Sequence, residues 1–198
     1  AHRTSLHARS EHLAGKHASA AGGRRFENQL MEFQEELDNF AKKAQEFCKW
    51  AESDFTDSLE EIKKAERYLA NLHSTILDLP ELFEIWNEVD ELGKKSEDKE
   101  TKVAQWKKIR DRFENLPING YWEIFDASEV DDESPVFAQI SDDLADIYGD
   151  LKDGLKFYQQ EKFAEAFWEW KFLFQIHWGN HLVGAQKAIR NYLSFKTE

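Results

Sequence analysis

The sequence predicts an all-α protein, folded as a single bundle of about six helices that ends in a long C-terminal helical hairpin. The chain has 198 residues, a length that suits one domain. It contains only 3 Pro and 9 Gly, too few for the many tight turns of a β-sandwich. Apolar residues make up 41% of the chain and include 7 Trp and 15 Phe, enough to fill a sizeable core.

The first predicted helix covers roughly residues 26–53, and the second begins near Ser58. Apolar residues of the first alternate steps of three and four along a narrow seam: Phe26, Leu30, Phe33, Leu37, Phe40, Ala44, Phe47 and Ala51. Ser58 and Glu61 form a capping-box signature for the second helix, which ends at Pro80. Such a seam also suits a coiled coil, but the further amphipathic helices that follow it favour a bundle within one chain. The oligomeric state stays open, and a homo-oligomer is possible.

The middle of the chain predicts two shorter helices and one irregular stretch. A third helix is expected around residues 82–92, with Gly93 as its stop. A fourth follows Ser96 and turns four apolar side chains inward: Val103, Trp106, Ile109 and Phe113. Residues 118–135 show no helical period. Their aromatic half is expected to plug one end of the bundle, and their acidic half to face water.

The C-terminal hairpin consists of a fifth helix over roughly residues 138–160 and a sixth over roughly residues 163–194. The fifth is expected to bury Ile140, Leu144, Ile147, Tyr148, Leu151, Leu155 and Tyr158. The sixth carries Phe163, Ala166, Phe167, Trp170, Phe174, Trp178, Ala185 and Ile189 at helical spacing. We therefore expect one domain over residues 26–198.

Residues 1–25 differ in composition from the rest of the chain. They carry a net charge of +4, which leaves −17 of the formal net charge of −13 to the remainder. Histidines stand at positions 2, 7, 12 and 17, a spacing that does not keep them on one helical face. We interpret this segment as an extraneous leader able to bind immobilised metal, with a basic native arm as the alternative.

Charge and cysteine content exclude several classes of function. A body this acidic repels phosphate backbones and anionic lipid surfaces, which argues against nucleic-acid and membrane partners. No segment has the run of about eighteen apolar residues that a membrane helix requires. The single cysteine, Cys48, rules out an intramolecular disulfide and fits a reducing cytoplasm. Its place on an apolar stripe predicts a buried, unreactive thiol.

Two blocks of the C-terminal half carry a resemblance to a known family. The first is S-D-D-L-A-D-I-Y, residues 141–148, followed by Asp150-Leu151-Lys152; the second is Trp178-Gly179 with Leu182-Val183. Weaker agreement covers residues 46–48 and 79–82. On these residues the chain resembles DUF5063, a bacterial family of uncharacterised proteins, over most of residues 26–193. The resemblance implies a helical bundle in a bacterial cytoplasm and supplies no activity, ligand or catalytic residue.

Two histidines of the sixth helix are the strongest candidates for a ligand site. His177 and His181 are four residues apart and share a helical face, and at about 100° per residue that face is the buried one. In an antiparallel hairpin, residues equally far from the turn lie at the same height. Asp146 is then level with His177, and Asp142 with His181. Imidazoles that point inward opposite aspartates are one way in which a helical bundle builds a metal site.

The helical projection also selects the carboxylate. Asp143 borders the apolar arc of the fifth helix, whereas Asp142 and Asp146 fall largely on its far side. Asp143 is therefore the expected partner of His181, with Asp150 as a more distant candidate. Two His with one or two Asp suit zinc, manganese or iron. The alternative is a pair of neutral buried imidazoles held by hydrogen bonds, with the aspartates capping a helix N-terminus.

The absence of a catalytic signature favours a function that is not enzymatic. The sequence contains no glycine-rich phosphate loop, no G-x-S-x-G and no H-E-x-x-H. The first hypothesis is a cytoplasmic protein-interaction or regulatory module that needs no cofactor. The second is a metal-binding protein or metal-dependent hydrolase that uses His177, His181 and Asp143. The sequence identifies neither the protein partner nor a substrate.

Overall fold

The computed structural model describes residues 32–81, 99–124 and 134–195, and within them the predicted helical fold is confirmed. The elements are α2 (Gln34–Glu52), α3 (Ser58–Asp78), α5 (Lys99–Phe113), β1 (Gly120–Glu123), β2 (Val136–Gln139), α6 (Ile140–Gln159), α7 (Phe163–Leu173), the π-helical turn η2 (Phe174–Trp178) and α8 (Gly179–Phe195). The predicted third helix, its stop at Gly93, the cap at Ser96 and the acidic residues 131–133 all lie outside the described residues, as does the leader. No described helix has both the length and the apolar character needed to cross a membrane.

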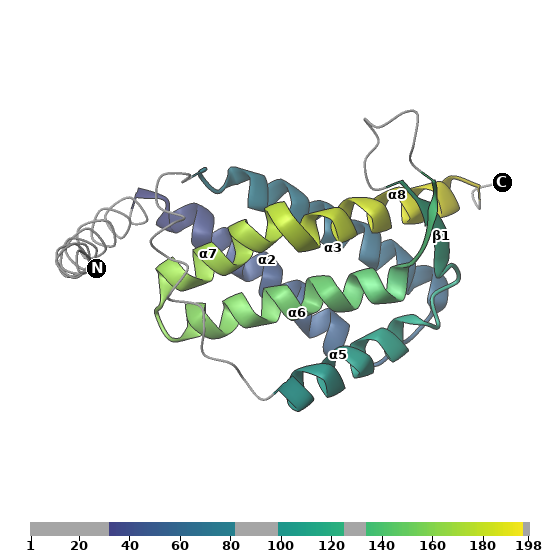
Figure 1. Ribbon diagram of the computed structural model, residues 1–198, viewed down its shortest axis with the longest axis horizontal. Helices are drawn as coiled ribbons and strands as arrows, with labels where there is room; N and C mark the ends of the chain where they lie inside the picture. The colour runs from purple at the N-terminus through teal and green to yellow at the C-terminus, as the bar shows by residue number, and fades with distance from the viewer. Residues whose placement is uncertain (1–31, 82–98, 125–133, 196–198) are drawn as a thin grey trace, which may run out of the picture.

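Helix α6 lies at the centre of the bundle and contacts α2, α5, α7 and α8 (Figure 1). Its predicted helical phase is confirmed by six of the seven side chains expected in the core, which are at most 5% exposed: Ile140, Leu144, Ile147, Tyr148, Leu151 and Leu155. The seventh, Tyr158, is only partly buried at the edge of the core. Burying each of the six contributes roughly 1.5–3 kcal/mol. Because this face of α6 is buried, the residues of the helix that reach the surface lie on either side of that face.

Helix α5 packs on α6 with less apolar contact than the sequence predicts. Ile109 and Phe113 are buried, but Val103, expected to point inward, is 57% exposed. Polar contacts join the two helices instead, including one from Trp106 to Asp146. The contact between α5 and α6 is therefore partly polar.

The predicted capping box at the start of α3 is wrong. Asp57, one residue earlier than the predicted cap, accepts hydrogen bonds from the backbone N–H groups of Leu59 and Glu60, both at 3.0 Å. Glu61 is fully buried instead and accepts a hydrogen bond from Trp50 Nε1 at 2.8 Å. Its carboxylate joins α2 to α3 and does not cap a helix.

Strand β1 lies within residues 118–135, where the sequence predicts irregular chain, and it pairs antiparallel with β2, which follows that stretch. The fold is therefore not purely α. The register places Trp122 opposite Phe137, with the ring centroids 5.9 Å apart. Cross-strand aromatic pairs of this kind stabilise short sheets. Because side chains alternate along a strand, Tyr121 packs against the core while Trp122 is 70% exposed. The expected aromatic plug is therefore right for Tyr121 and wrong for Trp122.

The predicted sixth helix is interrupted by the π turn η2. A Cβ on Gly179 would lie 2.1 Å from the carbonyl oxygen of Phe174, so the wide turn requires glycine at this position. A π turn adds a residue and rotates the following side chains by about 100°. The prediction that His177 and His181 point into the core is therefore wrong: their side chains are 45% and 29% exposed.

Candidate metal site

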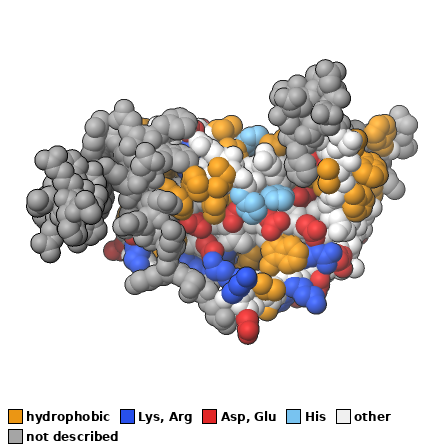
Figure 2. Space-filling view, in the orientation of Figure 1, with side chains coloured by type: hydrophobic (Ala, Val, Ile, Leu, Met, Phe, Trp, Pro, Cys, Tyr) orange, Lys and Arg blue, Asp and Glu red, His pale blue; other side chains and the backbone are white. Residues whose placement is uncertain are grey.

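Two histidines and one aspartate converge at the surface where η2 and α8 meet α6. His177, His181 and Asp146 each offer one ligand atom, and these atoms all lie within 4.8 Å of one another. Nε2 of His181 is 3.7 Å from Oδ2 of Asp146, and the imidazole centroids are 5.0 Å apart. Figure 2 shows histidine side chains at the centre of this face with acidic side chains beside them. Ligand bonds to zinc are about 2.0–2.2 Å long, so small side-chain rotations would bring the three groups into coordination distance.

Each imidazole is held by a carboxylate through Nδ1. His177 Nδ1 lies 2.6 Å from Oδ2 of Asp150, and His181 Nδ1 lies 2.9 Å from Oδ1 of Asp143. When Nδ1–H donates to a carboxylate, the lone pair of the neutral ring is on Nε2. Metal-binding histidines in proteins nearly always have such a partner, which fixes the tautomer and the ring orientation. Both rings thus have the support that a metal ligand needs.

The aspartate is held in the same way. Trp106 Nε1 donates a hydrogen bond of 2.8 Å to Oδ1 of Asp146. Oδ2 of Asp146 is the oxygen that faces Nε2 of His181. One oxygen is therefore used to orient the carboxylate, and the other is directed toward the histidines.

Asp143 lies beneath the site and is only 4% exposed. Burial raises the pKa of its carboxyl, while hydrogen bonds from His181 and Tyr121 act in the opposite direction. Tyr121 of β1 donates to Oδ2 of Asp143 at 2.9 Å. A Cβ on Gly184 would lie 2.5 Å from the Tyr121 hydroxyl, so glycine at 184 lets β1 approach α8 closely enough for this contact. The hydrogen bond to Asp143 raises the pKa of His181.

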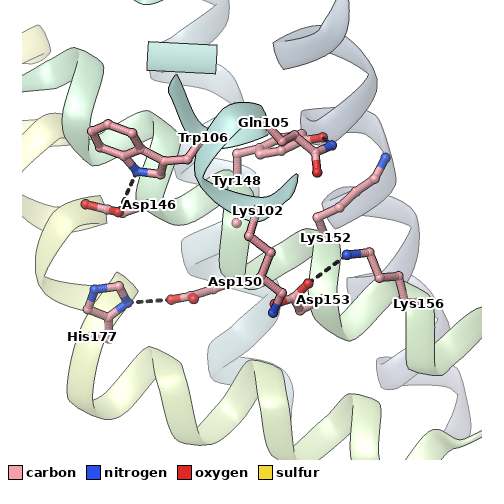
Figure 3. A pocket seen from close by; sticks show the side chains of 11 residues that line it. Lys102, Gln105, Trp106, Asp146, Tyr148, Asp150, Lys152, Asp153, Lys156 and His177 are labelled. Atoms are coloured by element: carbon pink, nitrogen blue, oxygen red, sulfur yellow. Dashed lines mark hydrogen bonds and ion pairs between the residues drawn. The ribbon is translucent and has the colours of Figure 1, made fainter. Parts of the chain in front are cut away.

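A pocket of about 280 Å³ opens beside the cluster, between α5, α6 and η2. His177 and Asp146 lie on one side of it, and three lysines lie toward the other: Lys102, Lys152 and Lys156 (Figure 3). The candidate site thus borders a cavity that a small molecule could enter.

The structure brings together most, but not all, of the residues that the sequence selects. Asp143 contacts His181 as expected, but it is Asp146 that lies near both histidines. The projection had placed Asp146 on the far side of the fifth helix. The available signal was the spacing of Asp143, Asp146 and Asp150, whose steps of three and four place them along one helical face, matching the pair of histidines.

The equal-height pairing of the hairpin is corrected by about one helical turn. His177 forms its hydrogen bond with Asp150 rather than with Asp146, although Asp146 remains nearby. Asp142 pairs with Arg110 at 2.6 Å instead of with His181. Side chains on a helix lean toward its N-terminus, so the histidines reach toward the turn of the hairpin. The pairing of residues at equal distance from the turn applies to Cα positions and does not predict which side-chain ends come into contact.

Comparison with known proteins identifies the family. The model of the family described as "Domain of unknown function (DUF5063)" matches residues 31–194. The chain belongs to DUF5063. A crystal structure of protein BF1032 from Bacteroides fragilis shares the fold of this DUF5063 chain, with a TM-score of 0.56 and 22% identity over 77% of this chain and 91% of that one. No curated protein matches significantly.

The cysteine of this DUF5063 protein offers no second reactive centre. Cys48 is buried as predicted, at 2% exposure. Burial raises the pKa of its thiol to about 12, so the nucleophilic thiolate is scarcely populated at neutral pH.

Proposed function

We propose that this protein binds a divalent transition metal ion through His177, His181 and Asp146. The observation that supports the proposal is that each of the three candidate ligands has a hydrogen-bond partner that orients it. Each of the three side chains uses one polar atom to hold an orienting partner. The three also offer ligand atoms that lie within 4.8 Å of one another. Three side chains that each have such a partner match the arrangement around ligands in known metal sites.

The donor set restricts the metal. Two imidazole nitrogens and one carboxylate oxygen suit zinc, iron and manganese, and zinc binds such a set more tightly than the other two. Three protein ligands leave coordination positions for water or a substrate, as in catalytic zinc sites. A water bound there would be acidified toward a pKa near 7, which is the basis of metal-dependent hydrolysis. Hydrolysis is therefore the reaction class that this site would support.

The competing explanation is a pair of structural ion pairs. Protonated His177 and His181 would then simply neutralise Asp150 and Asp143, and no metal would be needed. Partly exposed pairs of this kind contribute about 0–1 kcal/mol each. The two explanations differ in whether the cluster has measurable affinity for a metal.

Calorimetric titration of Zn²⁺ into protein that lacks residues 1–25 tests the proposal. The leader must be removed because its four histidines could bind the metal themselves. We expect one site, weakened at least about tenfold in His181→Ala and in Asp146→Asn, because each loses one of three ligands. His73→Ala is the matched control, since His73 lies on α3 and contacts Gln186. No saturable heat in the folded protein, or an equal loss in His73→Ala, would refute the site.

A second candidate function, binding to another protein, has a separate observation in its favour. A groove of about 400 Å³ runs between β1 and α8, lined in part by Trp122, Tyr192 and Phe195. Trp122 and Phe195 are 70% and 85% exposed. Exposed aromatic residues around a groove are typical of interaction surfaces.

Sedimentation over a concentration series tests this candidate for the case of a second copy of the chain. We expect association that Trp122→Ser abolishes. A monomer at every concentration would contradict self-association through this groove.

A further inference from the structure

Gly149 lies on the floor of the pocket, within α6. Glycine inside a helix costs roughly 0.5–1 kcal/mol relative to alanine, so its position needs a reason. Gly154 and Gly184 have a packing reason: a Cβ there would lie 2.1 Å from Trp170 Nε1 and 2.5 Å from the Tyr121 hydroxyl, respectively. A Cβ on Gly149 would meet nothing within 4 Å. Gly149 therefore borders a space that the surrounding chain does not fill.

The two ends of this space carry different chemistry. One end holds the metal ligands His177 and Asp146. At the other, Lys102 Nζ lies 2.5 Å and Lys156 Nζ 2.9 Å from the carboxylate of Asp153. Two ammonium groups thus share one carboxylate at a distance from the metal end. Figure 3 shows these lysines and the metal ligands bordering the same cavity.

The carboxylates of the pocket determine when an anion can enter. Asp146, Asp150 and Asp153 line it and offset the charges of its three lysines, so without a metal the pocket has no net positive charge to attract an anion. A divalent cation at the histidine end would neutralise two of these charges and present a positive centre. Entry of an anion should therefore depend on the bound metal.

We propose that this pocket binds a small oxyanion over Gly149, with one oxygen on the metal and the negative charge directed toward Lys102 and Lys156. The proposal rests on the metal site proposed above. A volume of about 280 Å³ is at the lower end for ligand pockets, so it suits a phosphate group or a small carboxylic acid. Both supply the same chemistry: oxygen donors for the metal and charge for the lysines.

Protein without residues 1–25, loaded with Co²⁺, allows a direct test. The visible spectrum of Co²⁺ changes when a new oxygen enters its coordination shell. Inorganic phosphate and acetate are titrated separately, with sodium chloride keeping the ionic strength constant. We expect a saturable spectral change, and the anion that saturates at the lower concentration distinguishes a phosphate site from a carboxylate site. The metal-free protein should bind neither anion.

Four variants locate the binding. Gly149→Leu should retain Co²⁺, since no ligand changes, and should weaken anion binding by about tenfold or more because the side chain fills the floor. Gly149→Ala, which adds one carbon, should titrate close to wild type. Lys102→Gln should weaken anion binding severalfold, whereas Lys107→Gln, on an exposed part of α5 outside the pocket, should not.

The outcomes separate this inference from the metal site. If Co²⁺ binds and neither anion produces a saturable change, the oxyanion site is wrong and the metal site stands. The same conclusion follows if Gly149→Leu and wild type titrate alike, because the anion is then bound elsewhere. If Co²⁺ itself does not bind, both proposals fail.

Discussion

His181 Nδ1 lies 2.9 Å from Oδ1 of Asp143, a carboxylate that is almost fully removed from water. The contact selects the ring tautomer in which Nε2 carries the lone pair, and it directs Nε2 toward Asp146. Asp143, which the sequence selects as a metal ligand, thus lies behind the candidate ligand His181, where it can set the orientation of the ring.

Replacing this carboxylate should weaken metal binding although no ligand is lost. Asp143→Asn is expected to lower Zn²⁺ affinity about 10–100-fold, the range for removing the partner of a metal-bound histidine. Calorimetric titration measures it. Asp142→Asn is the matched control, because Asp142 directly precedes Asp143 but pairs with Arg110 and not with a histidine. Equal affinities in the two variants would show that Asp143 does not orient the site.

Gly179→Ala tests whether the π turn sets the direction of the histidines. The added Cβ would lie 2.1 Å from the Phe174 carbonyl oxygen, so the turn must change shape. We expect a loss of about 2 kcal/mol or more in the free energy of unfolding, together with weaker Zn²⁺ binding. Gly149→Ala, where the new carbon meets open space, should instead be neutral or stabilising by about 0.5–1 kcal/mol. Urea denaturation of both variants measures these changes in the free energy of unfolding. A Gly179→Ala protein as stable as wild type would mean that the fold does not require the π turn.

Glu61 should make the fold sensitive to acid. Burial alone would raise the pKa of its carboxyl, but hydrogen bonds from Lys64, Thr56, Arg112 and Trp50 outweigh it and lower the pKa to about 2. Because the folded pKa lies below the unfolded value of 4.5, this contribution is complete above about pH 4.5 and is lost as the pH falls toward 2.

Glu61→Gln measures that contribution at neutral pH. It should cost about 3–5 kcal/mol, since it leaves the Arg112 side chain, which is only 10% exposed, without its carboxylate. The wild-type advantage should shrink in acid. Glu60→Gln, at an exposed position beside it, should cost little. Similar costs for the two variants would contradict the assigned network.

Glu169 should have the opposite pH dependence. Burial, followed by the charges of Asp153 and Asp150, raises the pKa of its carboxyl to about 7. The folded state therefore favours the protonated form, and stability falls as the pH rises from about 4.5 to about 7. Glu169→Gln in metal-free protein should be more stable than wild type by about 1–3 kcal/mol above pH 7, and equal to it in acid. A Glu169→Gln variant that is less stable than wild type at alkaline pH would contradict a raised pKa for Glu169.

Much of the helical fold follows from apolar spacing. The phase of α6 is confirmed from Ile140 to Leu155 because one side of a central helix must be buried. The strands are missed because four residues each are too short for a recognisable alternation, and the stretch 124–135 between them is too long for the short hairpin turn that would reveal the pairing. Trp122 belongs to the aromatic half that was expected to plug one end of the bundle, yet its place on the strand directs it to solvent.

The site could be predicted only in part, for two physical reasons. A helical projection assumes a constant 3.6 residues per turn, and η2 breaks that assumption next to His177. The projection also ranks carboxylates by distance from the apolar face, whereas Asp146 is held at the border of α6 by Trp106 of another helix. Sequence spacing selects the right helices and both histidines, but only tertiary contacts distinguish Asp143 from Asp146.

Thermal unfolding of leader-free protein, with and without Zn²⁺, tests the central claim most directly. A metal that binds only the folded state stabilises it by about 2.7 kcal/mol at a hundredfold excess over its dissociation constant. For a domain of this size the melting temperature should rise by roughly 5–10 °C. A chelator should reverse the rise, and His181→Ala should abolish it. A wild-type melting curve that neither Zn²⁺ nor chelator moves would show that His177, His181 and Asp146 do not form a metal site.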